Sequence, residues 1–61
     1  MKKEMLIFVD WNRGVWVVQY RDGLGEMIVE PTQYPANTAS IVVSDELKKQ
    51  RPEFTVFAKI H

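Results

Sequence analysis

Hydrophobic side chains in the first half of the chain fall in three short runs with the composition of β-strands. Residues 4–11, 15–21 and 26–30 are rich in β-branched and aromatic types. Asn12-Arg13-Gly14 separates the first two runs, and Asp22-Gly23-Leu24-Gly25 separates the second from the third. Both separators carry residues that tolerate the backbone angles of tight turns. Three strands with such short connections predict an antiparallel meander.

The segment over residues 36–50 has a helical period. Ala39, Val43 and Leu47 recur every fourth position, which places them on one face of a helix over about 38–50. The acidic residues of this segment come early and its lysines come late, an order that suits the helix dipole. We therefore favour a single helix here.

The same segment also admits a strand. The run Ser40-Ile41-Val42-Val43 is mostly β-branched, and as a strand it would leave a shorter helix beginning at Ser44. The pattern alone leaves this run open between the two structures. If the longer helix forms, Asn37 or Thr38 is expected to cap its start and Pro52 to end it.

Residues 54–60 alternate again and predict a last strand. One face of it carries Phe54, Val56, Ala58 and Ile60, and the other carries Thr55, Phe57 and Lys59. The predicted fold is α+β: a small antiparallel sheet in the order β-β-β-α-β, with one helix packed on one face. Residues 1–61 are expected to form a single domain, because a chain this short seldom divides.

Both faces of the first two predicted strands carry bulky apolar side chains. The two faces of the first strand carry Met5, Ile7, Val9 and Trp11 on one side and Leu6 and Phe8 on the other. Those of the second strand carry Trp16, Val18 and Tyr20 on one side and Val15, Val17 and Gln19 on the other. One helix cannot cover four strands completely, and a sheet with a solvated face alternates more cleanly. Either a small domain or barrel needs all these side chains for its core, or the second face is an interaction surface.

Composition restricts the sources of stability. The 61 residues include no cysteine and one histidine, His61, so a disulfide is excluded and the usual His/Cys zinc site is not expected. With 46% hydrophobic residues and zero net charge, the chain is expected to fold. Its stability must then come from packing, from self-association or from a partner.

The apolar runs are too short for a membrane protein. The first, over residues 5–9, is also short for a signal peptide, and no small-residue cleavage site follows it. We therefore expect a cytoplasmic protein without membrane contact. Because the chain starts at Met1 and contains no linker, we also expect a complete gene product.

The residues that could support catalysis are few and scattered. His61 is terminal and a poor general base, so Ser40 and Ser44 lack a histidine partner. The carboxylates are spread over predicted turns, strand ends and the helix, where such groups are usually solubilising or capping. The glycine-containing segment over residues 22–26 lacks the lysine and the spacing of a phosphate-binding loop. We expect no enzymatic activity, no cofactor and no metal.

The charge balance disfavours nucleic acid as a partner. Eight basic residues oppose eight acidic ones, and neither half of the chain forms a basic arm. Lys48, Lys49, Arg51 and Lys59, joined by His61, make a local basic cluster of the kind a helix C-terminus commonly carries. A nucleic-acid-binding β-sheet module is kept as an alternative function.

Residues 14–25 resemble the second strand and turn of the small arm-binding domains of phage-type integrases. The shared features are a Gly-x-Trp opening, an aromatic-Arg-Asp strand end and a glycine-containing turn. Those domains are three-stranded sheets plus a helix, and their sheet enters the DNA major groove. The resemblance implies Arg13, Trp16, Tyr20 and Arg21 as base or phosphate contacts. The chain lacks the family's basic surface and adds a strand after the helix, so we do not assign it to that family.

A protein partner fits the composition better, because aromatic and arginine residues near turns are typical of interface hot spots. The expected partner-binding residues are Trp11, Arg13, Trp16, Tyr20, Arg21 and Tyr34, the last in a loop predicted between Pro31 and Pro35. We expect a non-catalytic protein-binding module. Small cysteine-free α+β proteins are common in phages and mobile elements, where many inhibit or modulate a host enzyme or defence complex. A homodimeric structural component is a further alternative.

Overall fold

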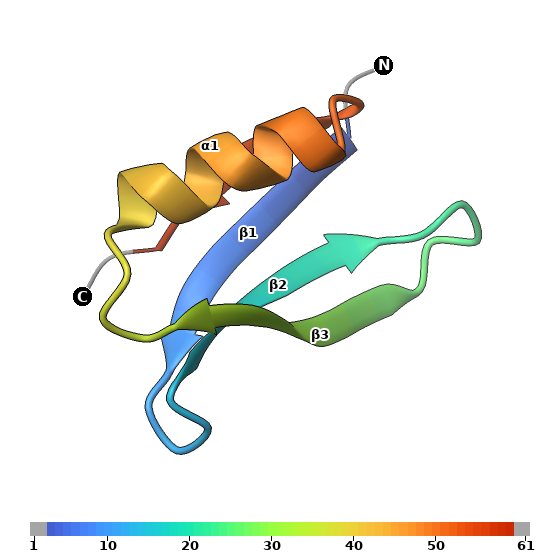
Figure 1. The fold of residues 1–61 in the computed structure, drawn as a ribbon. Coiled ribbons are helices and arrows are strands. Elements are labelled where there is room, and N and C mark those ends of the chain that lie inside the picture. The colour runs from blue at the N-terminus through green and yellow to red at the C-terminus, as the bar shows by residue number, and fades with distance from the viewer. Residues whose placement is uncertain (1–2, 60–61) are drawn as a thin grey trace.

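The computed structural model describes residues 3–59, which form a four-stranded sheet and a helix lying across one of its faces (Figure 1). The elements in chain order are β1 (Lys3–Asp10), β2 (Val15–Arg21), β3 (Met27–Pro35), α1 (Ser40–Gln50) and β4 (Phe54–Ala58). Across the sheet the strands lie in the order β3-β2-β1-β4. The predicted α+β class and β-β-β-α-β order are confirmed.

The sheet is mixed, because β4 runs parallel to β1 while β1, β2 and β3 form the expected antiparallel meander. This difference from a fully antiparallel sheet arises in the connection before β4. The strand before α1 is β3, which runs in the same direction as β1 because both are antiparallel to β2. Two successive strands that run in the same direction need a crossover connection of about a dozen residues, usually a helix. Here α1 is that crossover, since it returns the chain to the end of the sheet where β1 begins (Figure 1). As a result, β3 and β4 occupy the two edges.

The third strand is longer than the pattern over residues 26–30 predicts. The expected loop between Pro31 and Pro35 is wrong, because β3 continues to Pro35. Proline is tolerated here since β3 is an edge strand, and an edge has no neighbour that requires every backbone donor. Pairing with β2 is irregular near this end, where the Thr32 hydroxyl donates a hydrogen bond to the Trp16 carbonyl oxygen at 2.7 Å.

The helix α1 confirms the helical interpretation of residues 40–43 over the strand alternative. Neither Asn37 nor Thr38 caps it, contrary to expectation: Ala39 is the N-cap residue and makes no side-chain hydrogen bond. No acidic residue lies in its first turn, also contrary to expectation, whereas lysines occupy its last turn. The helix is therefore stabilised chiefly by burial of one face against the sheet.

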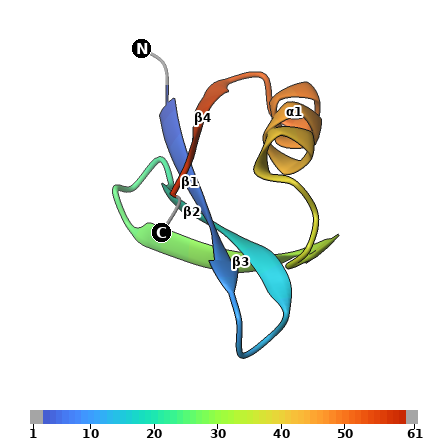
Figure 2. The ribbon, with the colours of Figure 1, turned by 90° about the vertical axis from the view of Figure 1, so that its left-hand side faces the viewer.

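The core lies between α1 and the face of the sheet that it covers (Figure 2). Its buried residues are Met5, Ile7, Trp16, Val18, Val43, Leu47 and Val56. The strand residues in this set all belong to the faces that the alternation predicts. The helix contributes two positions separated by one turn, again as the pattern predicts. β4 ends at Ala58, and Ile60 lies outside the described residues.

The turn between β1 and β2 depends on Gly14, whose φ of 71° lies in the left-handed region. Its N–H donates to the Asp10 carbonyl oxygen at 2.8 Å, and an added Cβ would meet no atom within 4 Å. Gly14→Ala should therefore destabilise the fold through backbone strain alone, by about 1–2 kcal/mol.

The matched control for this substitution is Gly23→Ala, because Gly23 also has open space but no left-handed φ. Urea unfolding followed by circular dichroism should show a lower midpoint for Gly14→Ala and an unchanged or slightly higher midpoint for the control. Equal midpoints for the two variants would mean that the turn does not impose this strain.

Candidate interaction surface

The face of the sheet opposite α1, which we call the open face, is lined by apolar side chains. They are Leu6, Phe8, Val17, Met27, Val29 and Phe57. Met27, Val29 and Phe57 are 47%, 54% and 49% exposed. Val17, by contrast, is 2% exposed and lies opposite Phe8 in register. The exposed apolar side chains thus lie on the two edge strands, with Leu6 and Phe8 partly exposed on β1, and exposed apolar area on one face often marks an interaction site.

Strand register arranges the open face in three rows that run across the sheet from β3 to β4. The second row is Val29, Gln19, Leu6 and Phe57, and the third begins Pro31, Val17, Phe8. The first row joins the pair Met27 and Arg21 to the pair Glu4 and Thr55, because Arg21 and Glu4 each lie one residue beyond the last β1–β2 pair, Tyr20 and Met5. Residues opposite one another in register point to the same face, so the side chains of a row adjoin. The second and third rows are mainly apolar, and the first carries one charge of each sign.

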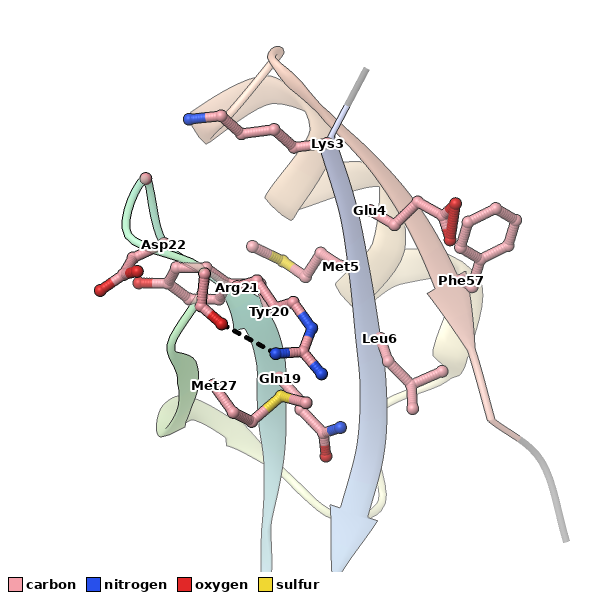
Figure 3. A pocket seen from close by; sticks show the side chains of 12 residues that line it. Lys3, Glu4, Met5, Leu6, Gln19, Tyr20, Arg21, Asp22, Met27 and Phe57 are labelled. Atoms are coloured by element: carbon pink, nitrogen blue, oxygen red, sulfur yellow. Dashed lines mark hydrogen bonds between the residues drawn. The ribbon is translucent and has the colours of Figure 1, made fainter. Parts of the chain in front are cut away.

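A shallow groove crosses the open face beside the turn between β2 and β3. Figure 3 shows Gln19, Arg21 and Met27 close together in this groove, with Phe57 on the other side of β1. Arg21 donates a hydrogen bond from Nη1 to the Gly25 carbonyl oxygen at 2.8 Å. Within residues 3–59 no carboxylate oxygen lies within 4 Å of its guanidinium. The cation is thus held in place by backbone and has no ionic partner in the described part of the chain.

The six residues expected to contact a partner lie in three different places. The turn between β1 and β2 holds Trp11 and Arg13, the helix-covered face holds Trp16, Tyr20 and Tyr34, and the open face holds Arg21. They do not form one surface. The DNA-contacting surface implied by the resemblance to integrase arm-binding domains is divided in the same way, because two of its four residues lie on the covered face.

Trp16 is a core residue. It is 5% exposed, and its indole Nε1–H donates to the Thr38 carbonyl oxygen at 3.0 Å, which ties β2 to the segment leading into α1. Tyr34 packs against the same core, and its hydroxyl accepts a hydrogen bond from Gln50 Nε2 at 3.1 Å. Both aromatic side chains therefore hold the helix on the sheet.

Tyr20 lies in a small aromatic and charged cluster at the margin of the covered face. Its ring meets the Phe54 ring edge to face, with 5.1 Å between centroids, and the Arg51 guanidinium carbon lies 5.2 Å from its centroid. The Tyr20 hydroxyl donates to Glu30 Oε1 at 3.4 Å, and Arg51 Nη2 lies 3.9 Å from Oε2 of the same carboxylate. Other residues of the chain thus occupy both the ring and the hydroxyl of Tyr20.

Trp11 is the accessible aromatic residue of the expected set, at 78% exposure. The turn that carries it is ordered by Asp10, whose Oδ1 accepts the N–H groups of Asn12 and Arg13 at 3.0 and 3.3 Å. Arg13 Nε also lies 3.6 Å from Asp10 Oδ2. Trp11 therefore presents an exposed indole on the turn that follows β1.

The predicted basic cluster is not assembled. Lys48 and Lys49 lie in the last turn of α1, and Arg51, which follows them, is engaged in the contacts described above. Arg51 precedes β4 and Lys59 follows it, so the two are separated by the length of this strand, five residues or about 16 Å. His61 lies outside the described residues.

Met27, Val29 and Phe57 are site residues that sequence reasoning missed. Partner contacts were expected at aromatic and arginine residues near turns, whereas these three belong to the edge strands. The signal that identifies them is the alternation within β3 and β4. Once Ile28 and Val56 face the helix, their neighbours must point to the open face.

Within residues 3–59, no group of three or more His, Cys, Asp or Glu side chains is placed to hold a metal ion. In the same range, no helix has the length and apolar character that crossing a membrane would require. Comparison with protein-family models, curated proteins and solved structures finds no match to this chain.

Proposed function

We propose that this chain is a non-catalytic protein-binding module and that its open face contacts the partner. The observation that carries the proposal is the half-exposed state of Met27, Val29 and Phe57, which adjoin Leu6 and Phe8 on one face. Covering these side chains removes apolar area from water, a gain of about 25 cal/mol for each Å². A protein surface is the partner that recovers this gain most fully, because it can match both the apolar centre and the polar margin.

The side-chain types on the open face also favour protein over nucleic acid. Methionine, aromatic residues and arginine are enriched at the centres of protein interfaces, and here Met27, Phe57 and Arg21 lie on one face. Nucleic-acid binding needs a surplus of positive charge. The first row of the open face carries one arginine and one glutamate, Glu4, so it has no net positive charge although the two side chains form no ion pair.

We further propose that the partner is a host enzyme or defence complex and that the chain acts as a phage-type or mobile-element inhibitor. Inhibition by such a module needs no chemistry, since a bound sheet face excludes other molecules from the surface beneath it. The support for this finer proposal is the size of the domain together with its apolar face.

The proposed function is tested by capture from a bacterial lysate with the full chain and two variants. Phe57→Lys places a charge on the open face, and Ile41→Lys places the same charge on α1, where Ile41 is 68% exposed. We expect a captured protein whose enrichment falls at least about tenfold with Phe57→Lys and is unchanged with Ile41→Lys. Mass spectrometry identifies the protein, and binding of the purified partner is then measured directly.

Both variants must first show wild-type circular dichroism and thermal unfolding, which is expected because both positions are exposed. Capture that survives Phe57→Lys would move the binding surface away from the open face. Capture lost only with Ile41→Lys would place it on the helix. If the wild-type chain enriches no protein over resin that carries no chain, in any lysate fraction, the protein-binding function fails.

A further inference from the structure

The rows of the open face are self-complementary. A two-fold axis parallel to the strands and midway between β1 and β2 would lay β2 over β1 of a second copy, and β3 over its β4. Each row of one copy then lies over the same row of the other copy, with the order of its residues reversed. In the first row, Arg21 faces Glu4 of the other copy. The unpaired cation of the open face thereby gains an opposite charge, and it does so twice in the pair.

Side-chain size is complementary under the same operation. In the second row Val29 faces Phe57, and Gln19 faces Leu6. The contact of Val29 with Phe57 places a small side chain against a large one, which is how the inner faces of packed sheets interdigitate across a separation of about 10 Å. The two half-exposed edge residues, Val29 and Phe57, would then cover each other.

The other face-to-face arrangement fits poorly. A two-fold axis perpendicular to the strands would lay each strand over its own copy in the reverse direction. With that axis at the level of Ile7 and Val18, near the middle of the two strands, Glu4 on β1 would face Asp10, so that like charges oppose each other, and Arg21 on β2 would face Val15. Like-charge juxtaposition at an interface is costly. Charge and size together therefore select the axis parallel to the strands.

We propose that a second copy of this chain covers the open face, about the two-fold axis parallel to the strands and midway between β1 and β2. The inference rests on the proposed function only in taking the open face as a protein-binding surface. The second copy is the molecule that covers the open face when no other partner is present.

The size of the face indicates that this dimer is reversible. Four strands about 4.8 Å apart and six residues of about 3.4 Å give a footprint of roughly 400 Å² in each copy. That lies at the low end of specific interfaces, where association is weak or transient. A weak dimer protects the apolar face in isolation and can be displaced by a partner with a larger interface.

Sedimentation over a concentration series up to about 1 mM tests the dimer directly. The wild-type chain should pass from monomer to dimer within this range. Val29→Glu and Phe57→Lys should each weaken association at least about tenfold, because each places a charge against an apolar side chain of the other copy. The double variant should recover most of the loss, since the introduced carboxylate of one copy then faces the introduced ammonium group of the other. Ile41→Lys, on α1, should associate as the wild type does.

The rescue in the double variant is specific for the proposed axis. Val29 and Phe57 lie on opposite edges of the sheet, three strand spacings or about 14 Å apart in one chain. A charge pair between them can therefore form only between copies. For the same reason, a mixture of isotope-labelled and unlabelled wild-type chain should give nuclear Overhauser contacts from Val29 methyl protons to Phe57 ring protons. This second measurement needs no variant and so does not depend on how the substituted chains fold.

Several results would overturn the inference. A wild-type chain that stays monomeric at about 1 mM has no such dimer. A dimer that tolerates both single substitutions, or that dissociates with Ile41→Lys, uses another face. A dimer without rescue in the double variant and without contacts from Val29 to Phe57 has a different axis. A monomer that still captures a partner through the open face would leave the proposed function standing, whereas a dimer that captures no protein would remove the function and keep the dimer.

Discussion

Trp16→Ala is expected to unfold most of the protein at 25 °C. The Trp16 side chain is 5% exposed in the core, and its indole N–H is bonded to the Thr38 carbonyl oxygen ahead of α1. Truncating a buried tryptophan to alanine costs about 3–5 kcal/mol. The core of a domain below about 70 residues seldom supplies more than about 3–5 kcal/mol in total. The substitution therefore removes nearly all of the available free energy of unfolding.

The other tryptophan provides the matched control. Trp11 is 78% exposed, so Trp11→Ala should change the free energy of unfolding by less than about 0.5 kcal/mol. Near-ultraviolet circular dichroism and urea unfolding measure both effects, and the remaining indole in each variant reports on one environment. Similar midpoints for the two variants would show that Trp16 does not hold the sheet and helix together.

Val43→Asp should detach α1 from the sheet. Val43 is fully buried between the helix and the strands, and an aspartate there would be a carboxylate without a partner among apolar side chains. An uncompensated buried charge costs about 3–5 kcal/mol. The free energy of unfolding should fall by an amount similar to the loss in Trp16→Ala, and the helical signal should fall with it.

Val42→Asp is the control for this substitution, because Val42 is the preceding residue of the same helical turn and is 47% exposed. Both variants change the same residue types, so the difference between them isolates burial from helix propensity. Far-ultraviolet circular dichroism and amide hydrogen exchange of residues 40–50 provide the readout. Equal losses in the two variants would mean that this face of α1 does not contact the sheet.

The sequence predicts the fold where one physical effect dominates. Three strands and two tight turns follow from β-branched runs and from Asn, Asp and Gly, and the turn residue Gly14 has the left-handed φ such turns use. Residues 40–43 balance strand propensity against helical spacing. The spacing prevails because it allows Val43 and Leu47 to enter the core on consecutive turns, and tertiary burial outweighs local preference.

Other features depend on neighbours that the sequence pattern does not specify. Pro31 and Pro35 are compatible with β3 only because that strand is at an edge, and edge position is a property of the whole sheet.

The parallel direction of β4, by contrast, could have been predicted from the element order. A strand that follows a helical crossover generally runs parallel to the strand before the helix, which here is β3.

The candidate site is less predictable than the fold. Aromatic type does not distinguish Trp16, which is buried, from Trp11, which is exposed, because Trp11 lies in the turn and Trp16 on the helix-covered face of β2. The open face is predictable as a surplus of apolar side chains on both sides of the strands. Which of these side chains stay exposed depends on which face of the sheet the helix covers, and the tertiary structure determines that face.

The pairing of the first strand with the last has a consequence for how the chain reaches its native state. Lys3 on β1 lies opposite Phe54 on β4, so this pairing closes a loop that contains most of the described chain. Contacts of such high sequence separation slow folding, because the entropy of closing the loop is lost before the contact stabilises it. During synthesis the meander can form early, but β1 waits for its neighbour until the end of the chain has been made. We therefore expect the hairpins to assemble first and the closing of the sheet to limit the folding rate.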